Sequence, residues 1–165
     1  MTHSAINTEK IETFVNQFWD HHILPALKAY VQIPNKSPYF DAAWEQQGHM
    51  EKALCLVQTW LETHQLSNSQ LHRGRLPGRT PLLLIEIPGS IDQTILMYGH
   101  LDKQPEMSGW RADLGPWIPV QEGDRLYGRG VADDGYAVFA SLCAIKALHD
   151  QGLPHARIII LIEFS

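Results

Sequence analysis

The sequence predicts an α/β fold in which a mixed, largely parallel sheet lies between two layers of helices. The strand candidates 81–87, 94–98 and 156–162 are too apolar for a sheet with one face in water. Strands of this kind are usually covered on both faces, which favours three layers, α/β/α. A helical pattern that ends at Gly152 stands directly before the last of these strands. Because strand–helix–strand order is typical of a right-handed crossover, at least some strands should pair in parallel.

Composition limits the class of protein. The chain has 165 residues, of which 44% are hydrophobic and 19% charged, as expected for one ordinary globular domain. No apolar run approaches the ~20 residues of a membrane-spanning helix and the N-terminus lacks a signal-peptide pattern, so we expect a cytoplasmic protein with no membrane partner. The net charge of -5 argues against nucleic acid and favours a small-molecule partner. Cys55 and Cys143 lack the spacing of a metal or redox pair and are expected to be core thiols.

The first third of the chain should be helical. Apolar residues recur at helical spacing over 8–31, with Asn7 or Thr8 as the cap. Pro25 removes a backbone donor within this stretch and should kink or split the helix. Two prolines in the segment 33–40 then predict a loop.

A second helix is expected to begin at Ala42 or Gly48 and to end at His64. Its buried side should consist of Met50, Ala53, Leu54, Val57, Trp60 and Leu61. A weak strand candidate at 70–76 follows, ahead of the apolar strands. Further along, 118–121 and 125–127 flank a Glu-Gly-Asp turn and predict a hairpin.

Two short motifs carry the residues suited to chemistry. An apolar strand ends on a glycine and delivers His100, with Asp102 two residues later. About thirty residues on, glycines flank Arg129 and are followed by Asp133 and Asp134, just before a helical pattern. Imidazole nitrogen and carboxylate oxygen at the edge of one sheet are what a metal site requires. The other histidines are scattered, and we expect surface or packing roles for them.

The same acidic residues also have purely structural interpretations. Asp133 fits the N-cap of the following helix, which does not exclude a metal ligand, because one carboxylate oxygen can cap while the other binds. For Asp134 a cap and a site role are equally favoured. Asp102 could instead be a turn residue.

The Gly128-Arg129-Gly130 run superficially suggests a phosphate loop. The full Gly-x-Gly-x-x-Gly pattern is absent, however, and tight turning explains the glycines better. For Arg129 a structural salt bridge with a neighbouring acid is favoured over a substrate carboxylate.

Two motifs in this order, Tyr98-Gly-His-Leu-Asp-Lys-Gln-Pro and Leu126-Tyr-Gly-Arg-Gly-Val-Ala-Asp-Asp-Gly, closely resemble the M20 family of co-catalytic zinc metallopeptidases. Gly109-Trp lies between them, as in that family. The family includes dipeptidases, carboxypeptidases, aminoacylases and succinyl-diaminopimelate desuccinylase. The resemblance implies a zinc-peptidase-like, truncated fold: residues 1–165 would be the N-terminal portion of the catalytic domain, without the remainder of that domain and the lid or dimerisation domain.

The resemblance also assigns roles within the two motifs. It implies that His100 is a ligand of one zinc ion, that Asp133 bridges two zinc ions, and that Asp102 accepts the other imidazole N–H of His100. Cobalt or manganese would be alternatives to zinc. It further implies a cis peptide between Asp133 and Asp134. The family commonly reads Asp-Asp-Lys-Gly at this turn, whereas here glycine comes one place early, at Gly135.

The implied activity is hydrolysis of an amide bond in a dipeptide, a short peptide or an N-acyl amino acid by a hydroxide that bridges the metals. The family's glutamate pair would fall just beyond Ser165, so we expect the 165 residues to bind zinc weakly and to be inactive. The alternative is a non-catalytic remnant or interaction module that keeps the fold. We expect a homodimer for the parent protein and self-association of the 165 residues through an uncovered sheet edge.

Overall fold

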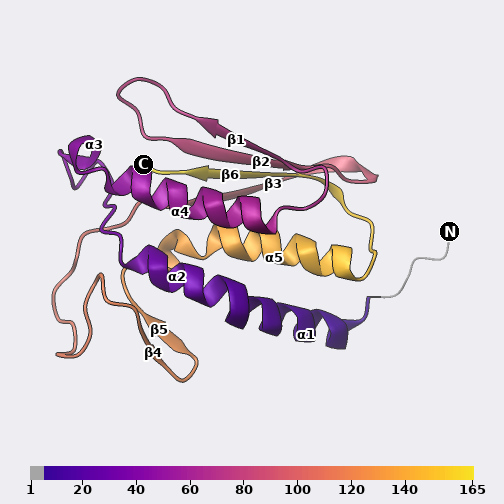
Figure 1. The fold of residues 1–165 in the computed structure, drawn as a ribbon, viewed down its shortest axis with the longest axis horizontal. Coiled ribbons are helices and arrows are strands. Elements are labelled where there is room, and N and C mark those ends of the chain that lie inside the picture. Colours follow the sequence, from indigo (N-terminus) through magenta and orange to yellow (C-terminus); the bar gives the residue numbers. More distant parts are fainter. Residues whose placement is uncertain (1–5) are drawn as a thin grey trace.

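The computed structural model describes residues 6–165, which form a mixed sheet with helices packed on one side of it (Figure 1). The α/β class is thus confirmed. The helices are α1 (Thr8–Phe18), the π-helix η1 (Trp19–Ile23), α2 (Leu24–Val31), α3 (Trp44–Gln47), α4 (His49–His64), the π-helical turn η2 (Val131–Gly135) and α5 (Ala137–Asp150). The strands are β1 (Gln70–Gly74), β2 (Leu82–Ile87), β3 (Ile91–His100), β4 (Val120–Glu122), β5 (Arg125–Tyr127) and β6 (Ala156–Glu163). None of the helices in residues 6–165 has the length and apolarity to span a bilayer.

The main sheet has the order β1-β2-β6-β3, and β4 and β5 form a separate hairpin, as predicted. β3 and β6 pair in parallel and are connected through α5, which confirms the predicted crossover. The other two pairings, β1 with β2 and β2 with β6, are antiparallel. The sheet is therefore mixed, but it is not largely parallel. The short loop between β1 and β2 forces these two neighbours to run in opposite directions.

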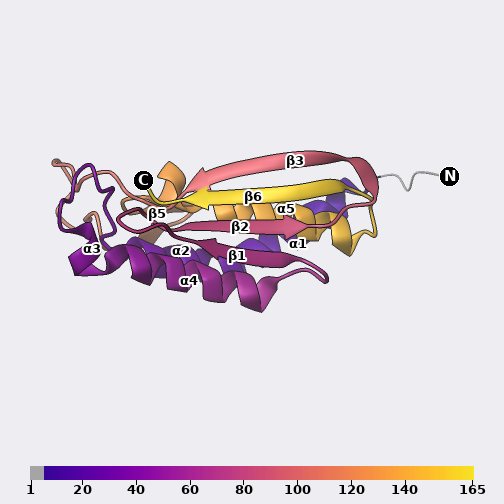
Figure 2. The same ribbon diagram turned by 90° about the horizontal axis from the view of Figure 1, so that it is seen from above.

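The layers differ from the three-layer α/β/α arrangement that the strands predict. Within residues 6–165 the helices cover one face of the sheet, and the opposite face is open (Figure 2). On β6 the inward residues Ile158, Ile160 and Ile162 are at most 2% exposed. On β3, by contrast, Leu96 is 64% and Tyr98 60% exposed. The apolar strands predicted cover on both faces, and the helices of residues 6–165 supply it on one face only.

The N-terminal helix begins and divides where the sequence indicates. The side chain of Asn7 caps α1 by accepting a hydrogen bond from the backbone N–H of Lys10, at 3.0 Å. Pro25 lies in the first turn of α2, directly after the π-helical segment η1. The predicted interruption thus takes the form of one wide turn, because the proline cannot donate to the preceding turn.

The second helix is also divided, at Gly48, whose φ of +68° is left-handed and separates α3 from α4. All six predicted core residues of α4 are buried. Cys143 is buried as expected, whereas Cys55 is exposed, so the core-thiol prediction is wrong for Cys55. Its place on α4 lies outside the apolar stripe that faces the sheet.

Candidate metal centre

His100 and Asp133 meet at the carboxyl end of the parallel strand pair. His100 is the last residue of β3, and Asp133 lies in η2, immediately ahead of α5. The distance from His100 Nε2 to Asp133 Oδ1 is 3.2 Å. Gly99 permits this approach, since a Cβ at that position would lie 2.8 Å from the Cβ of Ala137. The close passage of β3 over the start of α5 therefore brings the two motifs together.

Asp102 lies on the side of the His100 imidazole opposite Asp133. Its side-chain Oδ1 lies 3.0 Å from His100 Nδ1, and the residue is only 5% exposed. When ionised, a carboxylate only accepts hydrogen bonds, so Nδ1 of His100 carries the proton. In the neutral ring Nε2 then presents its lone pair toward Asp133. This is the tautomer that a histidine ligand needs, and the arrangement is the usual one behind a metal-bound imidazole.

The local charge is predominantly negative. Burial lowers the pKa of His100, but the carboxylates of Asp102, Asp134 and Asp133 oppose this effect, and the net pKa is raised. Burial raises the pKa of Asp102, against the opposing effect of His100. Three carboxyl groups around one imidazole favour the presence of a cation, either a proton or a metal ion.

The two adjacent aspartates have different partners. The peptide bond between Asp133 and Asp134 is cis, as the resemblance predicts. The N-cap interpretation is wrong for Asp133 and Asp134, because Tyr136 occupies the N-cap position of α5 and no side chain caps that helix. Asp134 Oδ2 instead accepts a hydrogen bond from the backbone N–H of His100, at 3.2 Å. The side chain of Asp133 is 59% exposed, which leaves it accessible to a further ligand.

Lys103 is a buried residue of this region that the sequence analysis did not identify. It is 1% exposed, and its Nζ donates to the backbone carbonyls of Tyr30 (2.7 Å), Val31 (3.4 Å) and Ile33 (2.6 Å). The ammonium also lies 3.8 Å from the centroid of the Tyr30 ring. Burial lowers the pKa of Lys103 to about 7, whereas the three carbonyls and the ring face favour the charged form. A single lysine in a polar loop gives no periodic signal of burial.

The segment after β3 is also held from the side of the 33–37 loop. The phenol of Tyr30 and the side-chain amide of Asn35 both donate to the carbonyl of Leu101. The backbone of Lys103 exchanges hydrogen bonds with this loop, accepting from Ser37 N and donating to Asn35 O. The Pro-rich loop predicted at 33–40 therefore supports the backbone that carries His100 and Asp102.

Arg129 does not form the predicted salt bridge. Its Nε donates to the backbone carbonyls of Pro105, at 2.9 Å, and Gln104, at 3.4 Å. The nearby acids are not its partners because the loop after Asp102 folds back onto the Gly128–Gly130 turn and presents carbonyls there. Arg129 thus ties the two motif-bearing loops together.

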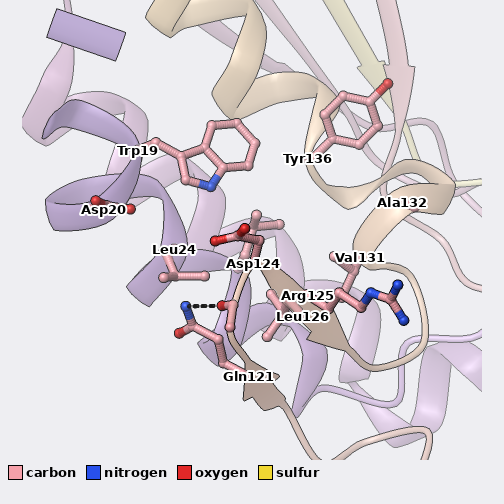
Figure 3. Close-up of a pocket in the computed structure, with 12 residues that line it drawn as sticks. Trp19, Asp20, Leu24, Gln121, Asp124, Arg125, Leu126, Val131, Ala132 and Tyr136 are labelled. Atoms are coloured by element: carbon pink, nitrogen blue, oxygen red, sulfur yellow. Dashed lines mark hydrogen bonds between the residues drawn. The ribbon is translucent and has the colours of Figure 1, made fainter. Parts of the chain in front are cut away.

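A cavity of about 420 Å³ lies between η1, the β4–β5 hairpin and η2 (Figure 3). Trp19 and Asp124 face each other across it, and Tyr136 and Val131 line the side nearest η2. Neither His100 nor Asp133 lines this cavity. Over the described residues 6–165, no cluster of three or more His, Cys, Asp or Glu side chains is arranged to hold a metal ion.

One family model matches the second half of the chain, and several curated proteins are similar to part of it. Residues 96–165 match the model of Peptidase family M20/M25/M40. The Beta-Ala-His dipeptidase of Mus musculus is 32% identical over 99 residues, which cover 57% of this chain and 20% of that protein. The succinyl-diaminopimelate desuccinylase of Gluconobacter oxydans is 41% identical over 64 residues, 39% of this chain and 16% of that protein.

Solved structures share the fold over nearly the whole chain. The di-peptidase Dug1p of Saccharomyces cerevisiae superposes with a TM-score of 0.74 at 19% identity, covering 94% of this chain and 34% of that one. Human carnosine dipeptidase 1 superposes with a TM-score of 0.72 at 23% identity, with the same coverage. The chain therefore spans about a third of the length of these proteins.

Proposed function

We propose, from the premise that this chain is related to peptidase family M20/M25/M40 through residues 96–165, that it contributes part of the metal centre of an amide-bond hydrolase. The observation that carries the proposal is the 3.2 Å approach of His100 Nε2 to Asp133 Oδ1, with Asp102 on the opposite side of the ring. One imidazole and one exposed carboxylate, both directed to the same point, suit zinc, which accepts nitrogen and oxygen ligands alike.

Each residue has a proposed role that follows from its contacts. His100 would hold one zinc ion through Nε2, and Asp102 would keep the proton on Nδ1 and fix the ring. Asp133 would bridge two ions, since its side chain is 59% exposed and one oxygen already faces His100. Asp134 would hold the backbone of His100 in place through its accepted hydrogen bond. Bound zinc would supply Lewis-acid polarisation of the substrate carbonyl and would lower the pKa of an attacking water.

The proposed substrate is a dipeptide, a short peptide or an N-acyl amino acid. Similar proteins are named Beta-Ala-His dipeptidase and succinyl-diaminopimelate desuccinylase, and both names denote cleavage of an amide bond. A dipeptide is the preferred substrate because the two solved structures described above are also dipeptidases.

The ligand count of residues 6–165 limits what they can do by themselves. A catalytic zinc usually has about three protein ligands and a water. His100 and Asp133 supply two donors, to be shared between two ions. We therefore propose that the 165-residue chain binds zinc weakly and does not hydrolyse dipeptides.

Zinc titration of the chain, followed by NMR of the histidine side chains, tests the proposal. We expect the His100 signals to move, and Asp133→Asn should weaken that binding at least tenfold. Asp102→Asn should weaken it about 10- to 100-fold, because the partner of a ligand histidine typically contributes that much. His72→Ala, an exposed substitution on β1, is the control and should leave the His100 titration unchanged. His100 signals that ignore zinc at millimolar concentration would contradict the metal assignment, and dipeptide hydrolysis by the chain would contradict the ligand count.

A further inference from the structure

Two histidines, His149 and His155, meet at the end of the sheet opposite the candidate metal centre. His149 lies in the last turn of α5, and His155 directly precedes β6. Their Nε2 atoms are 2.6 Å apart. β6 runs from this pair to Glu163, which pairs with His100, so a strand of eight residues, roughly 23 Å, separates the pair from the candidate metal centre. In Figure 1 the C-terminal end of α5 lies at the opposite end of the molecule from the C-terminus of the chain.

The protonation of His155 follows from its other nitrogen. His155 Nδ1 lies 2.7 Å from the carbonyl oxygen of Ala156. A carbonyl oxygen only accepts, so Nδ1 must carry a proton. In the neutral ring Nε2 of His155 therefore has a free lone pair, directed at His149. A backbone carbonyl that fixes the tautomer in this way is a regular feature behind metal-bound histidines.

The geometry points to a second site for a divalent transition-metal ion of the zinc, nickel and copper class, which we propose is held by His149 Nε2 and His155 Nε2. Two imidazole nitrogens on one tetrahedral zinc lie about 3.4 Å apart when each Zn–N bond is ~2.0–2.1 Å. The observed Nε2–Nε2 distance is 2.6 Å, so the two rings must move apart by about 0.8 Å to admit an ion. Imidazole selects these ions over magnesium and calcium, which prefer oxygen ligands.

In the proposed site, water would fill the coordination positions of the ion that the two histidines do not occupy. Both histidines line an open cavity of about 460 Å³, together with the polar side chains of Ser67, Asn68 and Ser90. The pKa of His149 is lowered by burial, then by the neighbouring His155 and Lys146, so its ring is available in the neutral form at pH 7. The Gly152 turn that joins α5 to β6 sets the relative position of the two rings. The site is therefore formed by the connection between α5 and β6, and it shares no residue with the proposed hydrolase centre.

Zinc titration of the whole chain, monitored by long-range ¹H–¹⁵N spectra of the imidazole nitrogens, tests the inference. We expect the Nε2 signals of His149 and His155 to shift together with one saturation curve, whereas magnesium shifts neither. His149→Ala and His155→Ala should each weaken this binding at least tenfold. His72→Ala on β1 is the matched control, because it removes an exposed histidine outside the pair.

The possible outcomes separate this site from the proposed catalytic centre, since the same spectra follow His100 as well as His149 and His155. Joint shifts of His149 and His155 support the second site whether or not His100 responds. The site is excluded if zinc moves one ring without the other, or if either substitution leaves the affinity unchanged. A pair that responds to pH but not to millimolar zinc would be a hydrogen-bonded histidine pair only.

Discussion

The side-chain stem of Lys103 packs directly against Gly130. A Cβ at position 130 would lie 2.7 Å from Cε of Lys103, and the φ of Gly130 is +82°. Lys103 follows His100 by three residues, and Gly130 precedes Asp133 by three residues. This contact therefore connects the two loops that carry the candidate metal ligands, independently of any metal.

Replacing Lys103 with Met should destabilise the fold by about 1–3 kcal/mol, because the backbone carbonyls of Tyr30, Val31 and Ile33 each lose the hydrogen bond from Nζ while the stem is preserved. Urea unfolding of the variant measures the change. Lys52→Met on α4 is the control: Lys52 is exposed, and the change there should stay within about 0.5 kcal/mol. Equal effects at the two positions would show that the carbonyl cluster does not depend on Lys103.

Gly130→Ala and Gly109→Ala form a matched pair for the Lys103 contact. Both glycines are left-handed, with φ of +82° and +84°, but a Cβ at Gly109 meets no atom within 4 Å. Both substitutions carry the conformational cost of a left-handed alanine, of the order of 1 kcal/mol, and only Gly130→Ala adds a collision with Lys103. We expect a lower melting temperature for Gly130→Ala than for Gly109→Ala. Equal melting temperatures of the two variants would contradict the close contact between Gly130 and Lys103.

The phenol of Tyr98 should lose its proton at an unusually high pH. Its Oη donates to Glu163 Oε1 at 2.7 Å, and this bond, followed by burial, raises the pKa of Tyr98 to about 12. A folded-state pKa above the ordinary ~10 means that the protonated phenol stabilises the fold below pH 10 and that this contribution is lost as the pH rises toward 12. The tyrosinate absorbance difference between the wild type and Tyr98→Phe isolates this step.

Glu163→Gln should lower the pKa of Tyr98 toward about 10, because the neutral amide is a weaker hydrogen-bond acceptor for the phenol than the carboxylate is. Glu86→Gln provides the control: Glu86 lies on β2 and pairs with Arg157, not with Tyr98. A raised pKa that survives Glu163→Gln would show that burial and the carboxylates of Asp102 and Asp134 cause it, not the Glu163 hydrogen bond.

We propose that the chain self-associates through β3. This strand ends the sheet, with β6 as its one strand neighbour among the described residues, and Ile95 and Leu96 are 46% and 64% exposed. Sedimentation velocity should show a dimer or larger species that grows with concentration, because an exposed apolar edge strand is a template for pairing. Leu96→Lys should reduce the association, whereas Leu76→Lys, at a 70% exposed loop position, should not. A monomer at high concentration would exclude the proposal.

Much of the local structure was predictable because it depends on neighbouring residues. Asn7 caps α1, Pro25 interrupts the first helix and the buried stripe of α4 follows its 3.6-residue period. The chemistry-bearing motifs were recognisable because a glycine, a histidine and an aspartate at a strand end form a local pattern. The predicted cap by Asp133 and the salt bridge of Arg129 were wrong because the actual partners come from distant segments.

By itself, the sequence determined the α/β class and the positions of most elements, since these depend on periodicity and spacing along short stretches. The candidate ligands followed from two short motifs and their resemblance to a known family. Only the tertiary structure decided that β6 lies between β2 and β3, that Lys103 is buried, and that His149 meets His155. Strand order and side-chain pairing between distant segments result from the packing of the whole core, and no short stretch of sequence contains that information.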